Sequence, residues 1–498
     1  MDRVTGSTLM KPKLTGREVD SFYHLSDVTM EHRRCRGISC FAAQHLDPDG
    51  WREALNQWPP VFCLGKCYAS PSTTETSSEP TIALCCDDPI VLKGVDDGSM
   101  RDLASYQAGG GYVALEQALK QPAERVVEQV EASQLRGRGG AGFPAGRKWR
   151  AVHDQPAGTK YVAANADEGD HGSYIDRFIM ERTPHRLLEA LTIAGYAVGA
   201  NKGYIYLRKE YPVAETATMA ALDEARAGGW LGPSVAGSDF AFEIEVVIGQ
   251  GSYVCGEETS MLNSIEHRRP EVRARPPFPT EHGLFNCPTL VNNVETLSSI
   301  PWIVQHGGDA YAARGFSRSR GTKAISLNSL FHRPGLYEVE FGLPLRTILE
   351  DIGGGLRTGE FKAVIVGGPL AGLVHPREFD TPFGFDEMHA IGASIGHGGI
   401  VAFDERTRMD LFLAHAFAFG AIESCGKCTP CRHGTRRAQT LFTQVADGHS
   451  LTPDEARELH SILDALRRTS LCGHGTGLAV VAASVMDKFG DEVASCLA

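Results

Sequence analysis

The sequence predicts an α/β protein built from several domains. A chain of 498 residues is longer than one hydrophobic core usually serves, so roughly two to four domains are expected. Helix-like and strand-like segments alternate between residues 101 and 315, and cysteines gather near both ends of the chain. These observations favour an α/β centre flanked by two cysteine-containing parts.

Hydrophobic periodicity gives the expected elements. A helix is expected at 122–133, and strands are expected at 160–165, 203–208 and 242–249. Short β-like runs between Pro and Gly turns follow at 322–330, 333–342 and 362–368. After residue 400 the pattern turns helical, and Thr452, Pro453 and Glu455 have the form of a capping box with Pro at the first helical position. We therefore divide the chain into 1–100, 101–318, 319–390 and 391–498.

Composition excludes several classes of function. The net charge of −12 disfavours binding to nucleic-acid phosphates. No apolar run approaches the ~20 residues of a membrane span, and residues 1–20 lack the apolar segment of a signal peptide, so we expect a cytoplasmic protein. Thirteen cysteines at short, clustered spacings favour metal or redox chemistry over disulfides.

The C-terminal cysteines carry the strongest chemical signal. Cys425, Cys428 and Cys431 form C-x2-C-x2-C, and the isolated Cys472 adds a fourth thiolate. Three thiolates in one loop can wrap one face of a cubane that a distant fourth closes, which predicts a [4Fe–4S] cluster. The alternative is a four-cysteine zinc site, which usually shows two separated C-x2-C pairs.

Two glycine-rich loops suit phosphate groups. Gly137, Gly139 and Gly142 satisfy G-x-G-x-x-G, although a helix-like segment precedes them rather than the strand of a dinucleotide fold. The second loop, 249–266, leaves a strand and enters a helix, where free N–H groups can bind an anion. The alternative is that both loops are simply tight turns.

An acidic cluster follows the strand at 160–165. Its members are Asn165, Asp167, Glu168 and Asp170. Ligand-binding residues of α/β proteins lie at this end of a strand, although a solvated acidic loop or a metal site would look similar.

Several long motifs resemble one known family. RGRGGAGFPAGRKW, ANADEGDHGSYIDR, GQGSYVCGEETSMLNSIE, RPPFPTEHGLFNCPTLVNNVETL and ESCGKCTPC resemble, in order over about residues 100–498, the NADH-binding flavoprotein subunit of complex I and its relatives in soluble hydrogenases and formate dehydrogenases. The resemblance implies an FMN that accepts hydride from NADH and passes single electrons to the [4Fe–4S] cluster. It also implies a Rossmann-like FMN domain, a ubiquitin-like β domain and a C-terminal helical bundle that holds the cluster.

The resemblance also assigns residues. The implied FMN shell comprises Gly137, Arg138, Gly139, Lys148, Asn165, Asp167, Asn292, Asn293 and Thr296, and Gly140, Gly142 and Gly256 are further cofactor-binding candidates. The implied NADH side comprises Phe143, Glu168, Glu257, Glu258 and Phe278, and Glu168, Asp170 and Glu258 are the catalytic candidates. Asp170, Ala151 and Arg275 depart from the family's usual Glu, aromatic residue and Lys, which touches the nicotinamide pocket. Carboxylates there would repel a 2′-phosphate, which favours NAD over NADP.

The N-terminal cysteines resemble those of a thioredoxin-like [2Fe–2S] module. Cys35 and Cys40 form one pair, Cys63 and Cys67 form the other, and 22 residues separate the pairs, fewer than that module normally has. Two interpretations stay open, a retained [2Fe–2S] cluster and a vestigial docking domain.

Together these patterns predict the diaphorase subunit of a cytoplasmic NAD-dependent formate dehydrogenase. The expected partners are a small [2Fe–2S] subunit and a molybdenum- or tungsten-containing subunit that converts formate, because no cysteine pattern here suits a metal-pterin or nickel site. The alternatives are the diaphorase of an NAD-reducing hydrogenase or of complex I and, from another class, a non-catalytic zinc-binding scaffold.

Overall fold

A parallel four-stranded sheet organises the first half of the chain. The computed structural model describes all residues except 1–22, 27, 47, 50–56, 157 and 498. The sheet has the order β6-β5-β4-β7, and its strands are β4 (Tyr161–Ala166), β5 (Lys202–Leu207), β6 (Glu243–Ile248) and β7 (Thr289–Asn293). The three strands expected between residues 160 and 249 are thus confirmed to within one residue at each end.

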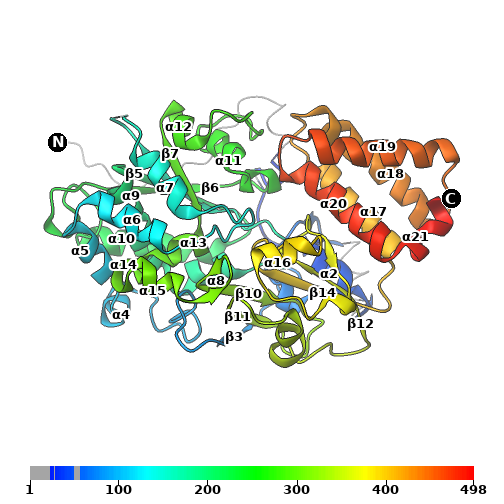
Figure 1. Cartoon of the computed structure of the whole chain (residues 1–498), viewed down its shortest axis with the longest axis horizontal. Coiled ribbons are helices and arrows are strands. Elements are labelled where there is room, and N and C mark those ends of the chain that lie inside the picture. The colour runs from blue at the N-terminus through cyan, green and yellow to red at the C-terminus, as the bar shows by residue number, and fades with distance from the viewer. Residues whose placement is uncertain (1–22, 27, 47, 50–56, 157, 498) are drawn as a thin grey trace.

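Helices cover both faces of this sheet. Successive side chains of each strand point to opposite faces, and both sets are mostly apolar, so both faces have to be buried. Val162 and Ala164 point to the larger core, against which α9 (Pro184–Val198) packs, while Ala163 points to the opposite core with residues of α11 (Glu258–Ile265). The expected helix at 122–133 is α6 (Ala123–Ala132), which is followed by α7 (Ala145–His153). The result is a three-layer α/β domain (Figure 1).

A six-stranded mixed sheet forms the next unit. Its order is β13-β12-β14-β10-β11-β3, with β3 (Thr81–Leu84), β10 (Thr322–Leu327), β11 (Gly335–Glu340), β12 (Phe361–Val366), β13 (Leu373–Val374) and β14 (Gly399–Asp404). The expectation that the chain is helical after residue 400 is wrong at β14, because this fully buried apolar run lies between β12 and β10. The sheet therefore draws strands from beyond 319–390 on both sides.

The C-terminal part is helical, as the sequence indicates. It contains α17 (Met409–Ile422), α18 (Thr435–Ala446), α19 (Pro453–Thr469), α20 (Gly473–Lys488) and α21 (Gly490–Leu497), at the right of Figure 1. The capping box is confirmed: the Glu455 N–H donates to Thr452 Oγ1 at 3.3 Å, and the Thr452 N–H donates to the Glu455 carboxylate at 2.9 Å. Helix α19 ends three residues before Cys472, so it delivers this ligand candidate to the other three cysteines.

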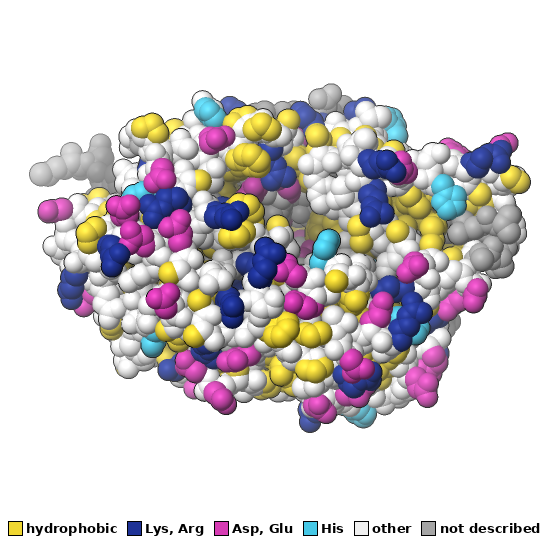
Figure 2. Space-filling model, viewed as in Figure 1, with side chains coloured by type: hydrophobic (Ala, Val, Ile, Leu, Met, Phe, Trp, Pro, Cys, Tyr) yellow, Lys and Arg dark blue, Asp and Glu magenta, His cyan; other side chains and the backbone are white. Residues whose placement is uncertain are grey.

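The N-terminal part is small in the described residues. Strand β1 (Arg34–Cys35) pairs in parallel with β2 (Pro60–Val61), and helix α2 (Ile38–Ala43) follows β1. The thioredoxin-like assignment of this part, and the four-domain division as a whole, stay predictions. Acidic and basic side chains are interspersed on the face shown in Figure 2. Within the described residues, no helix is both long enough and apolar enough to cross a membrane.

Candidate functional site

The central sheet reverses its strand order between β4 and β7. The chain adds β5 and β6 on one side of β4 and then returns to place β7 on the other. Ligands of open α/β sheets bind at the carboxyl ends of the strands beside such a switch point. Here those ends carry Asn165, which is paired in register with Asn293, and Asn292 one step earlier. Three predicted site residues are therefore neighbours at the expected place.

The first glycine-rich loop closes over this switch point. The Gly137 N–H donates to the Phe143 carbonyl at 2.8 Å, which folds the loop back on itself. The Arg138 backbone N–H donates to Thr296 Oγ1 at 2.8 Å, so the loop lies against the start of α13 (Val294–Ser298). A Cβ on Gly139 would lie 2.9 Å from the side chain of Asn293, closer than real Cβ contacts allow. Glycine is thus required there by close approach.

The Arg138 side chain is turned into the protein. It is fully buried, its Nη2 donates to Tyr311 Oη at 2.9 Å, and its guanidinium lies over the Phe341 ring. In this arrangement the loop contributes its backbone to the site, and the guanidinium anchors the loop to neighbouring elements.

The second loop completes the other side of the site. Asn165 Nδ2 donates to the Gly256 carbonyl at 2.8 Å, and a Cβ on Gly256 would lie 3.4 Å from the Asp167 carbonyl. Asp167 Oδ2 is buried and has no hydrogen-bond partner, and burial raises the pKa of this carboxyl group. A buried acceptor without a donor is costly, so this oxygen suits a ligand that donates hydroxyl groups.

Glu168 has a structural task that the sequence did not reveal. Its carboxylate accepts the backbone N–H groups of Ile175, Asp176 and Arg177 at 2.6–3.1 Å, together with the Ser173 hydroxyl at 2.6 Å. It therefore caps the start of α8 (Ile175–Arg182), where a negative charge is favourable. The geometry gives no support to the catalytic role predicted for this side chain.

Asp170 and Glu258, the other catalytic candidates, have different partners. The Tyr253 hydroxyl donates to Asp170 at 2.7 Å, and burial raises the pKa of Asp170. Glu258 accepts from Lys148 at 2.7 Å and from Arg275 at 3.1 Å. Burial opposes ionisation of Glu258, but these two cations outweigh it and lower its pKa.

Two aromatic residues expected on the NADH side lie at the surface. Phe143 is 47% exposed and Phe278 is 51% exposed, which leaves both rings accessible to a ligand. Glu257 caps α11 through the N–H groups of Thr259 and Ser260 and is 3.6 Å from Arg275. The structure thus brings the predicted nucleotide residues to one region, with carboxylates and cations already paired there.

The four predicted cluster ligands, Cys425, Cys428, Cys431 and Cys472, converge at one end of the helical part. The other three thiols lie close enough to Cys431 to contribute, after burial, to raising its pKa to about 12. Burial likewise raises the pKa of Cys472 to about 11. Val254 of the second glycine-rich loop shares a small buried cluster with Val272 and Cys425, so this loop borders both the switch point and the cysteines.

A second buried group is formed by Cys35, Cys40, Cys63 and Cys67. Cys63 Sγ and Cys67 Sγ are 3.6 Å apart, and hydrogen bonding to Cys40 and Cys63 raises the pKa of Cys35. Backbone N–H groups donate to two of the sulfurs: Gly37 to Cys35 and Gly65 to Cys63, each at 3.4 Å. Four clustered sulfurs with N–H···S contacts fit a cysteine-ligated iron–sulfur cluster.

Comparison with known proteins identifies the family. Residues 130–302 match the Nuo51 FMN-binding domain, and residues 412–496 match the NADH-ubiquinone oxidoreductase-F iron-sulfur binding region. The chain is 40% identical to the F 2 subunit of the NADH-quinone oxidoreductase of Rhizobium meliloti, over 81% of its length and 96% of that protein. The chain belongs to the complex I flavoprotein family.

Hydrogenase subunits are also similar. The NADP-reducing hydrogenase subunit HndC of Solidesulfovibrio fructosivorans is 40% identical over 80% of each chain. A structure of NAD+-reducing [NiFe]-hydrogenase in the H2-reduced state matches with a TM-score of 0.80 and 25% identity, over 96% of this chain and 87% of the other.

Membership confirms the oxidoreductase prediction. This complex I flavoprotein-type chain is an NADH dehydrogenase (diaphorase) subunit with an FMN-binding domain and a [4Fe–4S] region. The non-catalytic zinc scaffold gains no support. The observed site fits FMN, because both glycine-rich loops border the switch point and the buried, unpartnered Asp167 oxygen suits a ribityl hydroxyl. The individual residue roles stay predictions.

Two residues beside the site were not singled out from the sequence, His397 and Tyr253. His397 contacts both Glu168 and Asp176, although it belongs to the turn before β14 and is more than 200 residues distant in sequence. Tyr253 lies within one of the family motifs, but its contact with Asp170 becomes evident only in the folded chain.

Proposed function

We propose that this chain is the diaphorase subunit of an NAD-dependent formate dehydrogenase, in which electrons move between NAD(H) and a partner's metal site. One observation carries the electron-transfer part of this proposal. The segment from Tyr253 to Glu258 borders both cofactor regions: Gly256 contacts Asn165 at the switch point, and Val254 shares a small buried cluster with Cys425. A flavin and a cluster on either side of one short loop are suitably placed for electron exchange.

The chain's residues would hold FMN at the switch point. Gly139 and the backbone of Arg138 would line the phosphate side with Lys148, while Asn165 and Asp167 would bind ribityl hydroxyls. FMN, when bound, converts the two-electron oxidation of NADH into one-electron steps. Cys425, Cys428, Cys431 and Cys472 would ligate the cluster that takes up these electrons.

The NADH side follows from the exposed aromatic residues. Phe143 and Phe278 would stack against the nucleotide in the offset or edge-to-face arrangements that aromatic rings prefer. Glu257 and Glu258 would repel a 2′-phosphate, which favours NAD over NADP. Arg275 lies 3.6 Å from Glu257 and 3.1 Å from Glu258 and partly neutralises them, so it moderates this selectivity.

The N-terminal cysteines would ligate a [2Fe–2S] cluster. The four sulfurs are buried together, and two backbone N–H groups already point at them. Arg208 links this part of the chain to the acidic cluster after β4, because its Nη2 donates to the Cys63 carbonyl at 2.8 Å and its Nη1 contacts the Glu168 carbonyl.

The distal reaction needs another subunit. Within the sequence, no cysteine pattern suits a metal-pterin or nickel site, and the short N-terminal module favours a formate dehydrogenase, with a molybdenum- or tungsten-containing subunit and a small [2Fe–2S] subunit as partners. A hydrogenase diaphorase is the second candidate, because the [NiFe]-hydrogenase match covers 96% of this chain and so reaches into the N-terminal part.

The native complex decides between these candidates. After purification under anaerobic conditions, formate or hydrogen is supplied with NAD+ and NADH formation is followed at 340 nm as a standard readout. Formate-driven NADH formation is expected. Hydrogen-driven formation without formate activity would overturn the formate assignment and leave the diaphorase role intact.

A further inference from the structure

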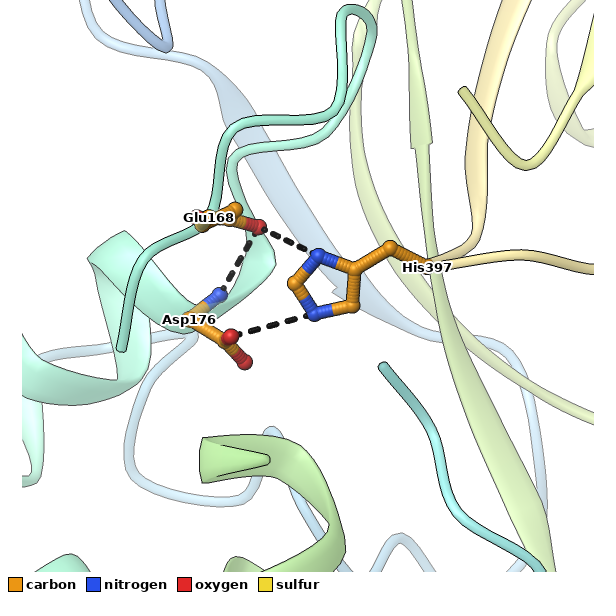
Figure 3. A group of neighbouring side chains, drawn as sticks. All are labelled: Glu168, Asp176 and His397. Atoms are coloured by element: carbon orange, nitrogen blue, oxygen red, sulfur yellow. Dashed lines mark hydrogen bonds and ion pairs between the residues drawn. The ribbon is translucent and has the colours of Figure 1, made fainter. Parts of the chain in front are cut away.

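His397 joins two parts of the molecule through charged contacts. It lies in the turn before β14, and its ring reaches Glu168 and Asp176 of the three-layer α/β domain (Figure 3). Its Nδ1 is 3.4 Å from Glu168 Oε1, and its Nε2 is 3.1 Å from Asp176 Oδ2. Since both ring nitrogens face acidic groups, a protonated imidazole is the form that satisfies them.

Two other interpretations of this cluster fail. Ser173, His397 and Asp176 have the connectivity of a nucleophilic triad, with 3.2 Å between Ser173 Oγ and His397 Nδ1. Their side chains are almost completely buried, so no substrate reaches Ser173. A metal ion is disfavoured because Glu168, the third ligand candidate, already accepts several N–H groups from α8.

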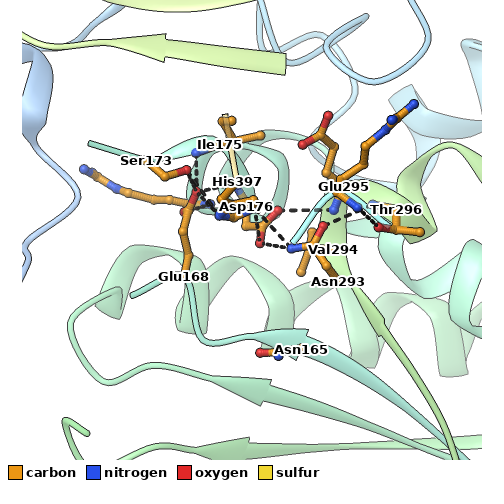
Figure 4. A network of polar contacts seen from close by, with 12 residues as sticks. Asn165, Glu168, Ser173, Ile175, Asp176, Asn293, Val294, Glu295, Thr296 and His397 are labelled. Atoms are coloured by element: carbon orange, nitrogen blue, oxygen red, sulfur yellow. Dashed lines mark hydrogen bonds and ion pairs between the residues drawn. The ribbon is translucent and has the colours of Figure 1, made fainter. Parts of the chain in front are cut away.

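The cluster leads directly to the flavin site. Asn293 Nδ2 donates to Asp176 Oδ2 at 2.6 Å and lies 3.1 Å from His397 Nε2, which contacts the same oxygen. Asn293 Oδ1 accepts the Thr296 N–H at 3.2 Å, which fixes the amide orientation and caps α13 (Figure 4). Asn293 also packs beside Gly139. A shift of Asp176 would therefore move Asn293 and change its packing against the first glycine-rich loop.

Other charged groups lie near the His397 ring. Lys323 Nζ donates to the His397 carbonyl at 3.0 Å and pairs with the buried Glu295. The titratable groups that face or influence the imidazole from the surrounding elements are Glu168, Asp170, Asp176 and Lys323. Burial works against protonation of His397, but the attraction of Asp176 and Glu168 outweighs it and raises the pKa of His397 to about 9.

We propose that His397 is a positioning residue for FMN: it orients Asp176 and Asn293, both of which it contacts, so that flavin affinity depends on this contact between the six-stranded sheet and the three-layer α/β domain. The inference rests on the proposed placement of FMN at the switch point. Retention of the cofactor would then depend on an electrostatic contact made by a residue that is far in sequence from the glycine-rich loops.

FMN retention by the full chain tests the proposal. The dissociation constant is measured by flavin fluorescence between pH 7 and 10 for the wild type and His397→Gln. At pH 7 we expect about tenfold weaker binding for the variant, the order expected when a charge-assisted hydrogen bond becomes a neutral one. Wild-type affinity should fall as the pH passes about 9, whereas the affinity of the variant should stay flat up to the pH at which free FMN itself ionises.

His332→Gln is the matched control, because His332 is an exposed histidine near the same sheet. It should keep the wild-type affinity and pH profile. A purely structural role of His397 would lower the thermal midpoint without changing the pH profile of FMN binding. If His397→Gln does not fold, the wild-type profile decides: an affinity that does not change around pH 9 overturns the proposal. A wild-type chain that binds no FMN overturns the proposed function, and this inference with it.

Discussion

Replacing Lys148 by Ala separates a structural ion pair from a cofactor contact. Lys148 Nζ is 2.7 Å from Glu258 Oε2, and these side chains are 25% and 18% exposed. Glu258 keeps Arg275 at 3.1 Å after the substitution, so no carboxylate is left without a cation. The loss of folding stability should therefore be about 1 kcal/mol or less, as for other partly exposed pairs.

The effect on FMN should be larger. If Lys148 contacts the phosphate, its removal deletes a hydrogen bond to a charged group, worth about 1.5–3 kcal/mol. That corresponds to a dissociation constant about 10- to 150-fold higher. Fluorescence titration of deflavinated protein with FMN measures it, and Lys148→Arg should recover part of the affinity.

Lys120→Ala is the control for this measurement. Lys120 is 76% exposed and makes only a 3.7 Å pair with Glu116 on the same helix, so its removal should leave FMN binding unchanged. A Lys148→Ala chain that is folded and binds FMN within about twofold of wild type would refute the phosphate assignment, since the lost contact should cost at least about tenfold.

Three further substitutions test the cluster sites and the fold. Cys472→Ser should lower the iron content by the [4Fe–4S] share and stop electron transfer to a partner, while reduction of the flavin by NADH continues; unchanged iron would show that the fourth ligand is wrong. Cys63→Ser should remove about two irons per chain and the corresponding EPR signal, by the two-iron stoichiometry of such clusters, and a loss of about four irons would point to disruption of the C-terminal site instead. Thr452→Ala should destabilise α19 by about 1 kcal/mol through loss of its cap, seen as a lower calorimetric midpoint, and an unchanged midpoint would mean that this helix does not limit unfolding.

The sequence predicted those elements well whose signal is local, within a few neighbouring residues. The strands near Tyr161, Lys202 and Glu243 have apolar runs bounded by turn residues, and Thr452 with Glu455 is a local capping signal. Strand β14 was missed because Gly399–Asp404 is followed at once by a long helical pattern, and its identity as a strand depends on pairing with β12 and β10.

The site was predicted in part for the same reason. Asn165, Asn293 and the glycine-rich loop are recognisable as motifs, and the structure brings them together at one switch point. The contact of His397 with Asp176 depends on packing between parts of the chain that are distant in sequence, and the helix cap by Glu168 depends on the path of the loop between β4 and α8. No spacing rule in the sequence contains that information.

Anaerobic titration of the purified full chain with NADH, followed by visible absorption and EPR, shows whether electrons pass from NADH through a flavin to the C-terminal cysteines. We expect NADH to bleach the flavin absorption and to produce the EPR signal of a reduced [4Fe–4S] cluster in the wild-type chain, and the cluster signal to be absent from the Cys472→Ser chain. An NADH-treated wild-type chain with neither flavin bleaching nor a cluster signal would contradict the diaphorase function.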